Sequence, residues 1–274
     1  MRTSLLLKIA AVLMVVVTIF TLASCSLFDE PAEEETTTER PAVALEARPE
    51  TTAQVVAYFN RVVNNIKASR PGVSSSRSYD VKNVDTGDTA EAKALIQFAK
   101  SFSEALEKVK DSKEYGEDLN DFLPLKGTDT VSRLTEADVV SAELTDVEDD
   151  QYVYDVHIAL QNSADRNGSV ANAFDFNIEK SEVLDTFTDY KDSVEVGDYN
   201  VSYDECEIFA RVNKETNQVL SLNYVMNASV TASVSFCGSL ADLGETDVSF
   251  TLREERSFND FVWEEPTEAE TAAE

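Results

Sequence analysis

The feature that most constrains this 274-residue chain is one long alternation of apolar and polar residues. Every even-numbered position from Leu220 to Phe236 carries an apolar side chain. A period of two is typical of a β-strand that buries one face and exposes the other. The pattern predicts one strand of about 18 residues, or two strands that keep the same phase. Because a straight strand of that length approaches about 60 Å at ~3.3 Å per residue, we expect it to bend strongly.

Shorter alternations elsewhere predict further strands around this one. Alternating residues on both sides of the acidic turn at 148–150 predict a β-hairpin over residues 140–160. Residues 206–212 repeat the pattern, and residues 248–252 are placed to pair back on the long strand. The sheet is therefore expected to be antiparallel.

The segment before these strands has the period of an α-helix instead. Thr51 and Gln54 form a capping box, and apolar residues at i, i+4, i+7 and i+11 predict an amphipathic helix that ends at Pro71-Gly72. After a polar connection over residues 73–86, a second apolar stripe predicts another helix over residues 89–110. The stripe consists of Leu95, Phe98, Phe102, Leu106 and Val109.

Two helices followed by strands define an α+β fold. We expect two N-terminal amphipathic helices packed on a curved antiparallel β-sheet, as a half-barrel or a cystatin-like helix-on-sheet arrangement, in a single domain over residues 51–263. A further short helix is expected over residues 181–190.

Residues 1–24 have the layout of a secretory signal. Arg2 and Lys8 flank the start of an apolar run over residues 9–20, which is too short for a permanent membrane span. The segment closes with Leu22-Ala23-Ser24-Cys25, and this ending resembles the lipobox of bacterial lipoproteins.

That resemblance implies that Cys25 receives a diacylglyceryl group and that the peptide bond before it is cut. The protein is then expected to be lipid-anchored on the extracytoplasmic face of the cell membrane. Residues 26–50 are acidic, contain prolines and have no apolar period, so with Cys25 they are predicted to form a disordered tether over residues 25–50. Residues 264–274 are expected to be an equally acidic, frayed tail.

The formal charge of −29 restricts the partners of the chain. A body this acidic repels both nucleic acid and anionic lipid headgroups. Nucleic-acid binding is therefore excluded, and attachment to the membrane has to come from the lipid on Cys25.

The inner row of the long strand is the candidate ligand-binding surface. In architecture the chain is similar to half-barrel bacterial lipoproteins, whose curled sheet wraps around helices and can hold lipid. The second half of the row has small side chains, so a concave face would leave room for a lipid or another apolar ligand unless the helices fill it. The candidate residues are Tyr224, Met226, Ala228, Val230, Ala232, Val234 and Phe236.

Cys206 and Cys237 are the cysteines that remain after Cys25. Cys206 has the even parity of the buried residues of its strand and is expected to face the core. Cys237 has odd parity and is expected to face the opposite side, so the two sulfur atoms cannot meet the geometry of a disulfide. The sequence predicts two free thiols.

No motif in the sequence predicts an enzyme. The common signatures of serine hydrolases, zinc proteases, phosphate loops and dinucleotide sites do not occur. The single histidine, His157, is predicted to face solvent. Acidic clusters at residues 146–150 and 198–205 lack the spacing of a calcium-binding loop. We therefore expect no metal site and no cofactor. Whether either cluster binds Ca²⁺ is a question that the sequence does not answer.

The sequence therefore predicts a membrane-anchored, non-enzymatic envelope lipoprotein that binds an apolar ligand or lipid against its curved sheet. The alternative is an interaction or sensor module of a surface complex, which would use the outer sheet face and loops and take no small ligand. A third alternative is an envelope hydrolase built on carboxylates.

Overall fold

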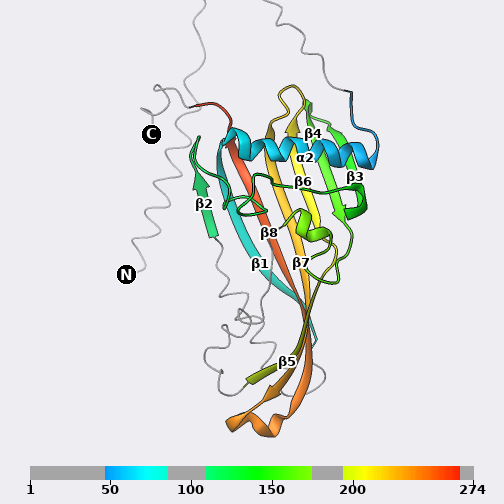
Figure 1. Cartoon of the computed structure of the whole chain (residues 1–274), viewed down its shortest axis with the longest axis vertical. Helices are drawn as coiled ribbons and strands as arrows, with labels where there is room; N and C mark the ends of the chain where they lie inside the picture. The colour runs from blue at the N-terminus through cyan, green and yellow to red at the C-terminus, as the bar shows by residue number, and fades with distance from the viewer. Residues whose placement is uncertain (1–46, 86–108, 175–193, 266–274) are drawn as a thin grey trace, which may run out of the picture. The chain divides into compact units, whose positions relative to one another are not determined.

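The structure is a computed structural model that describes residues 47–85, 109–174 and 194–265 (Figure 1). These residues belong to one unit of the chain that begins at Ala44. No helix among them has the length and apolarity needed to cross a membrane. The predicted signal, Cys25 and most of the predicted tether lie outside the described residues.

Helix α2 (Thr52–Ser69) begins at the predicted capping box. Gln54 N donates to Thr51 Oγ1 (3.3 Å), and Thr51 N donates to the Gln54 side chain (3.2 Å). The helix ends at Arg70, whose backbone is left-handed with φ 50°. The whole predicted apolar stripe is buried in the core: Val55, Val56, Phe59, Val62, Val63 and Ile66.

Eight antiparallel strands form the sheet on which α2 packs. Their order is β2-β1-β8-β7-β6-β4-β3, and β5 pairs with β7 off this path. The strands are β1 (Gly72–Asp85), β2 (Val109–Lys113), β3 (Val139–Val147), β4 (Asp150–Leu160), β5 (Val194–Tyr203), β6 (Glu207–Asn213), β7 (Val219–Phe236) and β8 (Glu245–Val262). Short 3₁₀ segments occur at Glu136–Asp138, Ser169–Asn172 and Gly238–Leu243.

β7 and β8 are the longest strands and determine the length of the sheet. β7 has 18 residues, so the single-strand interpretation of its alternation is confirmed. On one side it pairs with β8; on the other it pairs with β6 up to Val225 and with β5 from Ala228 onward. Figure 1 shows both strands twisting as they run from the end crossed by α2 toward their shared turn.

The two faces of the sheet differ in burial. We call the face that packs on α2 the covered face and the opposite face the outer face. Residues opposite each other on neighbouring strands share a face. Ile208 and Tyr224 are such a pair on the covered face and are buried, whereas the next pair, Phe209 and Asn223, lies on the outer face and is not.

A buried lysine attaches the connection between β2 and β3 to the helix. Lys67 Nζ donates hydrogen bonds to the carbonyl oxygens of Leu125 (2.9 Å), Thr128 (2.9 Å) and Asn120 (3.2 Å). Burial lowers the pKa of this ammonium group, and Asp121 opposes that effect. The three carbonyl groups replace the water that the buried charge has lost.

An ion pair with a buried carboxylate joins β1 to β8 on the covered face. Arg77 Nε and Nη2 lie 2.6 and 2.9 Å from the two carboxylate oxygens of Glu254, whose side chain is 1% exposed. Arg256, opposite Arg77 in the register, donates a hydrogen bond to the Phe122 carbonyl oxygen. The sheet and the loop above it are therefore held by charged groups as well as by apolar packing.

The expected fold class is wrong, because the described chain is mostly antiparallel sheet with a single α-helix rather than two N-terminal helices on a sheet. Of the second predicted helix, residues 89–108 lie outside the described residues, and Val109 and Lys110 belong to β2. Residues 73–85 of the predicted polar connection belong to strand β1. The short helix expected over residues 181–190 also lies outside the described residues.

The remaining strand predictions are confirmed. β3 and β4 form the predicted hairpin, and β8 pairs back on β7 with Phe250 opposite Val230 and Leu252 opposite Ala228. Leu220 is an exception, since it is exposed although its parity predicts burial. An irregularity in the β6–β7 register places Val219 in the buried position instead.

Candidate functional site

The predicted ligand-binding row lies on the covered face of β7. Its members Tyr224, Met226, Ala228, Val230, Val234 and Phe236 are buried, and Ala232 is half-buried. Ala232 also lies in the wall of a hollow bounded by described residues of β5, β7 and β8. The structure therefore places the row in the core.

Tyr224, at the upper end of the row, has an unusual environment. Its ring packs edge-on against Phe174 (5.2 Å between centroids) and Phe258 (6.3 Å). Its hydroxyl oxygen is buried and has no hydrogen-bond partner among the described residues. Burial raises the pKa of this phenol, and the nearby Arg256 partly opposes the rise.

Both thiols are free in the described structure, as the parity argument predicts. Cys206 is buried, and burial raises the pKa of its thiol to about 11. Its Sγ lies 3.7 Å from the carbonyl oxygens of Asp204 and Asn227. Cys237 is half-buried beyond the end of β7.

The acidic cluster at 146–150 is used in part for internal ion pairs. Asp146 accepts hydrogen bonds from Lys214 and, at 2.6 Å, from Arg48 Nη1. The hydrogen bond from Lys214 is the largest cause of the lowered pKa of Asp146. In the described ranges no group of three or more His, Cys, Asp or Glu side chains is arranged to hold a metal ion.

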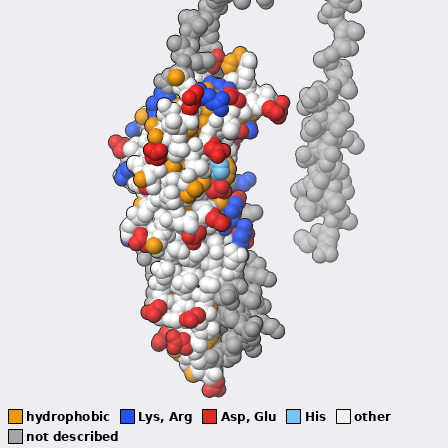
Figure 2. All heavy atoms as spheres, turned by 90° about the vertical axis from the view of Figure 1, so that its right-hand side faces the viewer, with side chains coloured by type: hydrophobic (Ala, Val, Ile, Leu, Met, Phe, Trp, Pro, Cys, Tyr) orange, Lys and Arg blue, Asp and Glu red, His pale blue; other side chains and the backbone are white. Residues whose placement is uncertain are grey.

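His157 is half-exposed on the outer face and has two partners that its sequence neighbourhood does not reveal. Its Nε2 lies 2.9 Å from Glu207 Oε1, and its ring stacks on Phe209 at 4.6 Å between centroids and 3° between planes. Register explains the stacking, because Phe209 of β6 stands directly opposite His157 of β4. In Figure 2 the histidine is visible at the surface in the upper half of the molecule.

A charged pair continues this patch along the same two strands. Arg211 Nε lies 2.9 Å from Asp155 Oδ1, and this contact raises the pKa of Arg211. Both rings and both residues of the charged pair line a hollow of about 410 Å³. We call the five residues His157, Phe209, Glu207, Asp155 and Arg211 the ring patch.

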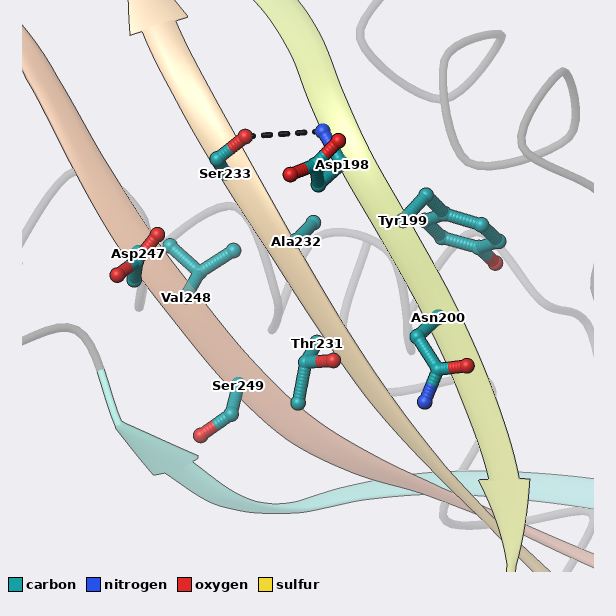
Figure 3. Close-up of a pocket in the computed structure, with 9 residues that line it drawn as sticks. All are labelled: Asp198, Tyr199, Asn200, Thr231, Ala232, Ser233, Asp247, Val248 and Ser249. Atoms are coloured by element: carbon teal, nitrogen blue, oxygen red, sulfur yellow. Dashed lines mark hydrogen bonds between the residues drawn. The ribbon is translucent and has the colours of Figure 1, made fainter. Parts of the chain in front are cut away.

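A second, larger hollow of about 740 Å³ lies at the other end of the sheet, over β5, β7 and β8. We call it the groove (Figure 3). Its walls come from Asp198, Tyr199, Asn200, Thr231, Ala232, Ser233, Asp247, Val248 and Ser249. No member is a lysine or an arginine, and Figure 3 shows hydroxyl, amide and carboxylate groups distributed along three neighbouring antiparallel strands.

A bulge in β5 shapes one side of the groove. Gly197 and Asp198 stand together opposite Ser233, where the register between Val196 and Tyr199 shifts. Asp198 N donates to Ser233 Oγ (2.9 Å), the contact drawn in Figure 3. A Cβ atom at Gly197 would lie 2.4 Å from that same oxygen, so the position requires glycine for the close approach of the two strands.

Sequence reasoning missed both outer-face features, and the cause differs between them. The ring patch joins residues that are 50 positions apart, such as His157 and Glu207, so it exists only once the strand register is known. The groove had a visible signal in the odd-numbered polar residues Ser229 to Ser235, which alternate with the apolar row. That signal indicates an exposed face without indicating a hollow.

Comparison with protein families, with curated proteins and with solved structures finds no match for this chain.

Proposed function

We propose that this protein is a non-enzymatic, lipid-anchored binding protein of the extracytoplasmic membrane face, and that its ring patch is the contact surface for a protein partner of a surface complex. The stacked, exposed pair of His157 and Phe209 is the observation that carries this proposal. Exposed aromatic groups surrounded by charges that can form ion pairs are typical of protein contact surfaces.

The charges of the ring patch favour a partner with its own mixed charges. Arg211 and Asp155 pair with each other, and Glu207 pairs with His157. Both pairs are solvent-accessible, so each contributes little to the stability of the fold and remains available for exchange with a partner's charges. The aromatic rings supply the apolar area at the centre of the surface.

The test measures saturable binding of the purified full-length chain to envelope preparations from cells that lack the protein. Phe209→Ser with Arg211→Glu is expected to weaken binding about tenfold or more, since a lost central aromatic residue costs about 2 kcal/mol. Tyr115→Ser is the matched control, because Tyr115 and Phe209 are both 38% exposed and Tyr115 lies outside the patch. Equal loss in both variants, or no loss in the first, contradicts the proposal.

An apolar ligand or lipid on the covered face is a second candidate function. The α-helix α2 crosses the upper end of the sheet in Figure 1, and Val230 and Val234, toward the end of β7, are buried on the covered face. Native mass spectrometry of the full-length chain after exposure to envelope lipids tests it. A retained lipid mass that Val230→Trp abolishes supports the carrier; a clean apo mass rejects it.

A further inference from the structure

We propose that the groove over β5, β7 and β8 binds an uncharged polyhydroxylated ligand, a segment of a neutral glycan. The groove shares no wall residue with the hollow of the ring patch. This inference therefore goes beyond the proposed function, and either one can fail while the other holds.

The register of the three strands arranges the side chains of the groove in rows. Asp247 stands opposite Ser233, which also faces the Asp198 bulge. The next row on the outer face consists of Asn200, Thr231 and Ser249. The side chains on β5 and those on β8 are two strand spacings apart, or about 10 Å. Successive rows along the strands are about 7 Å apart. The groove is thus a shallow trough with a floor of short hydroxyl side chains on β7.

The wall groups match the hydrogen-bonding capacity of a sugar. Hydroxyl groups of Thr231, Ser233 and Ser249 both donate and accept, and the amide of Asn200 does so through separate atoms. The carboxylates of Asp198 and Asp247 accept only, and each can take two hydrogen bonds from neighbouring hydroxyl groups of one ligand. An apolar ligand would leave all these groups unpaired, at a cost in affinity.

The charge in the walls of the groove disfavours anionic ligands. The parts of β5, β7 and β8 that form the walls, residues 194–203 and 228–252, contain no lysine and no arginine, whereas Asp198 and Asp247 are acidic. The nearby basic side chain on β1 is Lys82, which stands opposite Thr251 and lies 3.6 Å from the carboxylate of Asp80. In Figure 2 the lowest part of the visible face shows acidic and uncharged groups. A phosphate or carboxylate group would meet two carboxylates and no basic residue in the groove walls.

Size and accessibility also fit a ligand of this class. The volume of about 740 Å³ falls within the range of small-ligand sites, roughly 300–1,000 Å³. Asp198, Asn200, Thr231 and Asp247 are exposed in the free chain, so a ligand reaches them without a rearrangement of the strands. The row of Asn200, Thr231 and Ser249 carries no charge, which favours a neutral chain over a polycation along the groove.

The test titrates maltotetraose, cellotetraose and chitotetraose against the full-length chain, in a detergent without a sugar headgroup, by ligand-observed NMR. At least one tetrasaccharide is expected to bind with a Kd of about 1 mM or tighter. Thr231→Val with Asp247→Asn is expected to weaken that binding about tenfold, because the Thr231 hydroxyl is lost and one acceptor oxygen of Asp247 becomes a donor. The matched control is Thr246→Val, which changes the same type of residue next to Asp247 on the opposite face of β8.

Three results would overturn the proposal. One is that none of the three tetrasaccharides binds. Another is that Thr246→Val weakens binding as much as the groove variant does. The third is that an octalysine peptide binds in the groove while the sugars do not, which would make the groove a cation-binding surface. Raising NaCl from 50 to 300 mM should leave sugar binding unchanged, and a steep loss of sugar binding would also contradict the proposal.

Discussion

Lys67 is the residue whose environment differs most from what its type predicts. Lysine is among the side chains that are least often buried, yet this one is 7% exposed beneath the loop that it supports. Its ammonium group is balanced by three backbone carbonyl oxygens rather than by a carboxylate in hydrogen-bonding contact. One side chain thereby satisfies carbonyl groups of Asn120, Leu125 and Thr128 that the irregular loop does not pair in a strand or helix.

We predict that Lys67→Met lowers the free energy of unfolding by about 2–3 kcal/mol, because the carbonyl oxygens of Asn120 and Thr128 lose the donor that Lys67 supplies, whereas that of Leu125 keeps Thr128 Oγ1. Urea denaturation of the full-length chain measures the change. Lys126→Met is the matched control, since Lys126 belongs to the same loop and is exposed. A change of less than about 0.5 kcal/mol for Lys67→Met, as expected for the control, would show that the three contacts contribute nothing.

The two free thiols differ in burial, and this difference gives a chemical prediction. The pKa of Cys206 is raised to about 11, so at pH 8 its thiolate form is scarce, and the residue is also buried. We expect iodoacetamide at pH 8 to alkylate Cys237 first and Cys206 only in denaturant. Mass spectrometry of the peptides identifies the site. Equal rates in the folded chain would contradict the placement of Cys206 in the core.

At the scale of elements, the strands that were predicted differ from those that were missed in how they present apolar residues. β7 could be predicted from the sequence because one complete face of the strand is apolar. β1 could not be predicted in this way, because Arg77 and Tyr79 occupy its covered face, where half-buried Arg77 pairs with the buried carboxylate of Glu254 on β8. A long-range ion pair leaves no periodic signal in either segment.

β5 was not predicted, because a bulge interrupts the alternation of side chains along the strand. Gly197 and Asp198 together oppose one residue of β7, so the alternation changes phase within the strand. The same bulge places Asp198 beside Ser233 in the groove. The groove could therefore not be predicted without knowing the strand register, whereas the buried face of β7 could.

The bulge is testable by a double-mutant cycle. Gly197→Ala is expected to destabilise the chain by about 1 kcal/mol, because the new methyl group displaces Ser233 Oγ from its hydrogen bond with Asp198 N. In a Ser233→Ala background the nearest neighbour of that methyl group is 3.6 Å away, an ordinary contact, so the same substitution should cost less. Additive effects in thermal unfolding would refute this account of the close approach.

For the whole molecule, the strongly acidic charge opposes the close approach to the membrane that the predicted anchor implies. A chain of formal charge −29 is repelled by anionic membranes, and the predicted tether would keep the folded part at a distance from the lipid headgroups. In the proposed arrangement, attachment would depend on acyl chains, at about 0.8 kcal/mol per buried CH₂ group.

We predict that Cys25→Ala abolishes labelling by a palmitate analogue. Cys237→Ala should leave the labelling unchanged, since Cys237 belongs to the folded part. In-gel fluorescence measures both outcomes; fractionation does not decide, because cleavage before residue 25 is expected to require the cysteine and the uncleaved apolar segment would itself hold the variant at the membrane. Labelled Cys25→Ala protein would show that the lipid is not attached to this residue.

We propose that the protein acts through the outer face of its sheet. Site-specific photo-crosslinking in intact cells tests this proposal, with the photoreactive residue placed at Phe209 in the ring patch or at the equally exposed Tyr115. We expect a discrete adduct of one size from position 209, which Arg211→Glu diminishes, and none of that size from position 115. No adduct from position 209, or the same adduct from both positions, would contradict it.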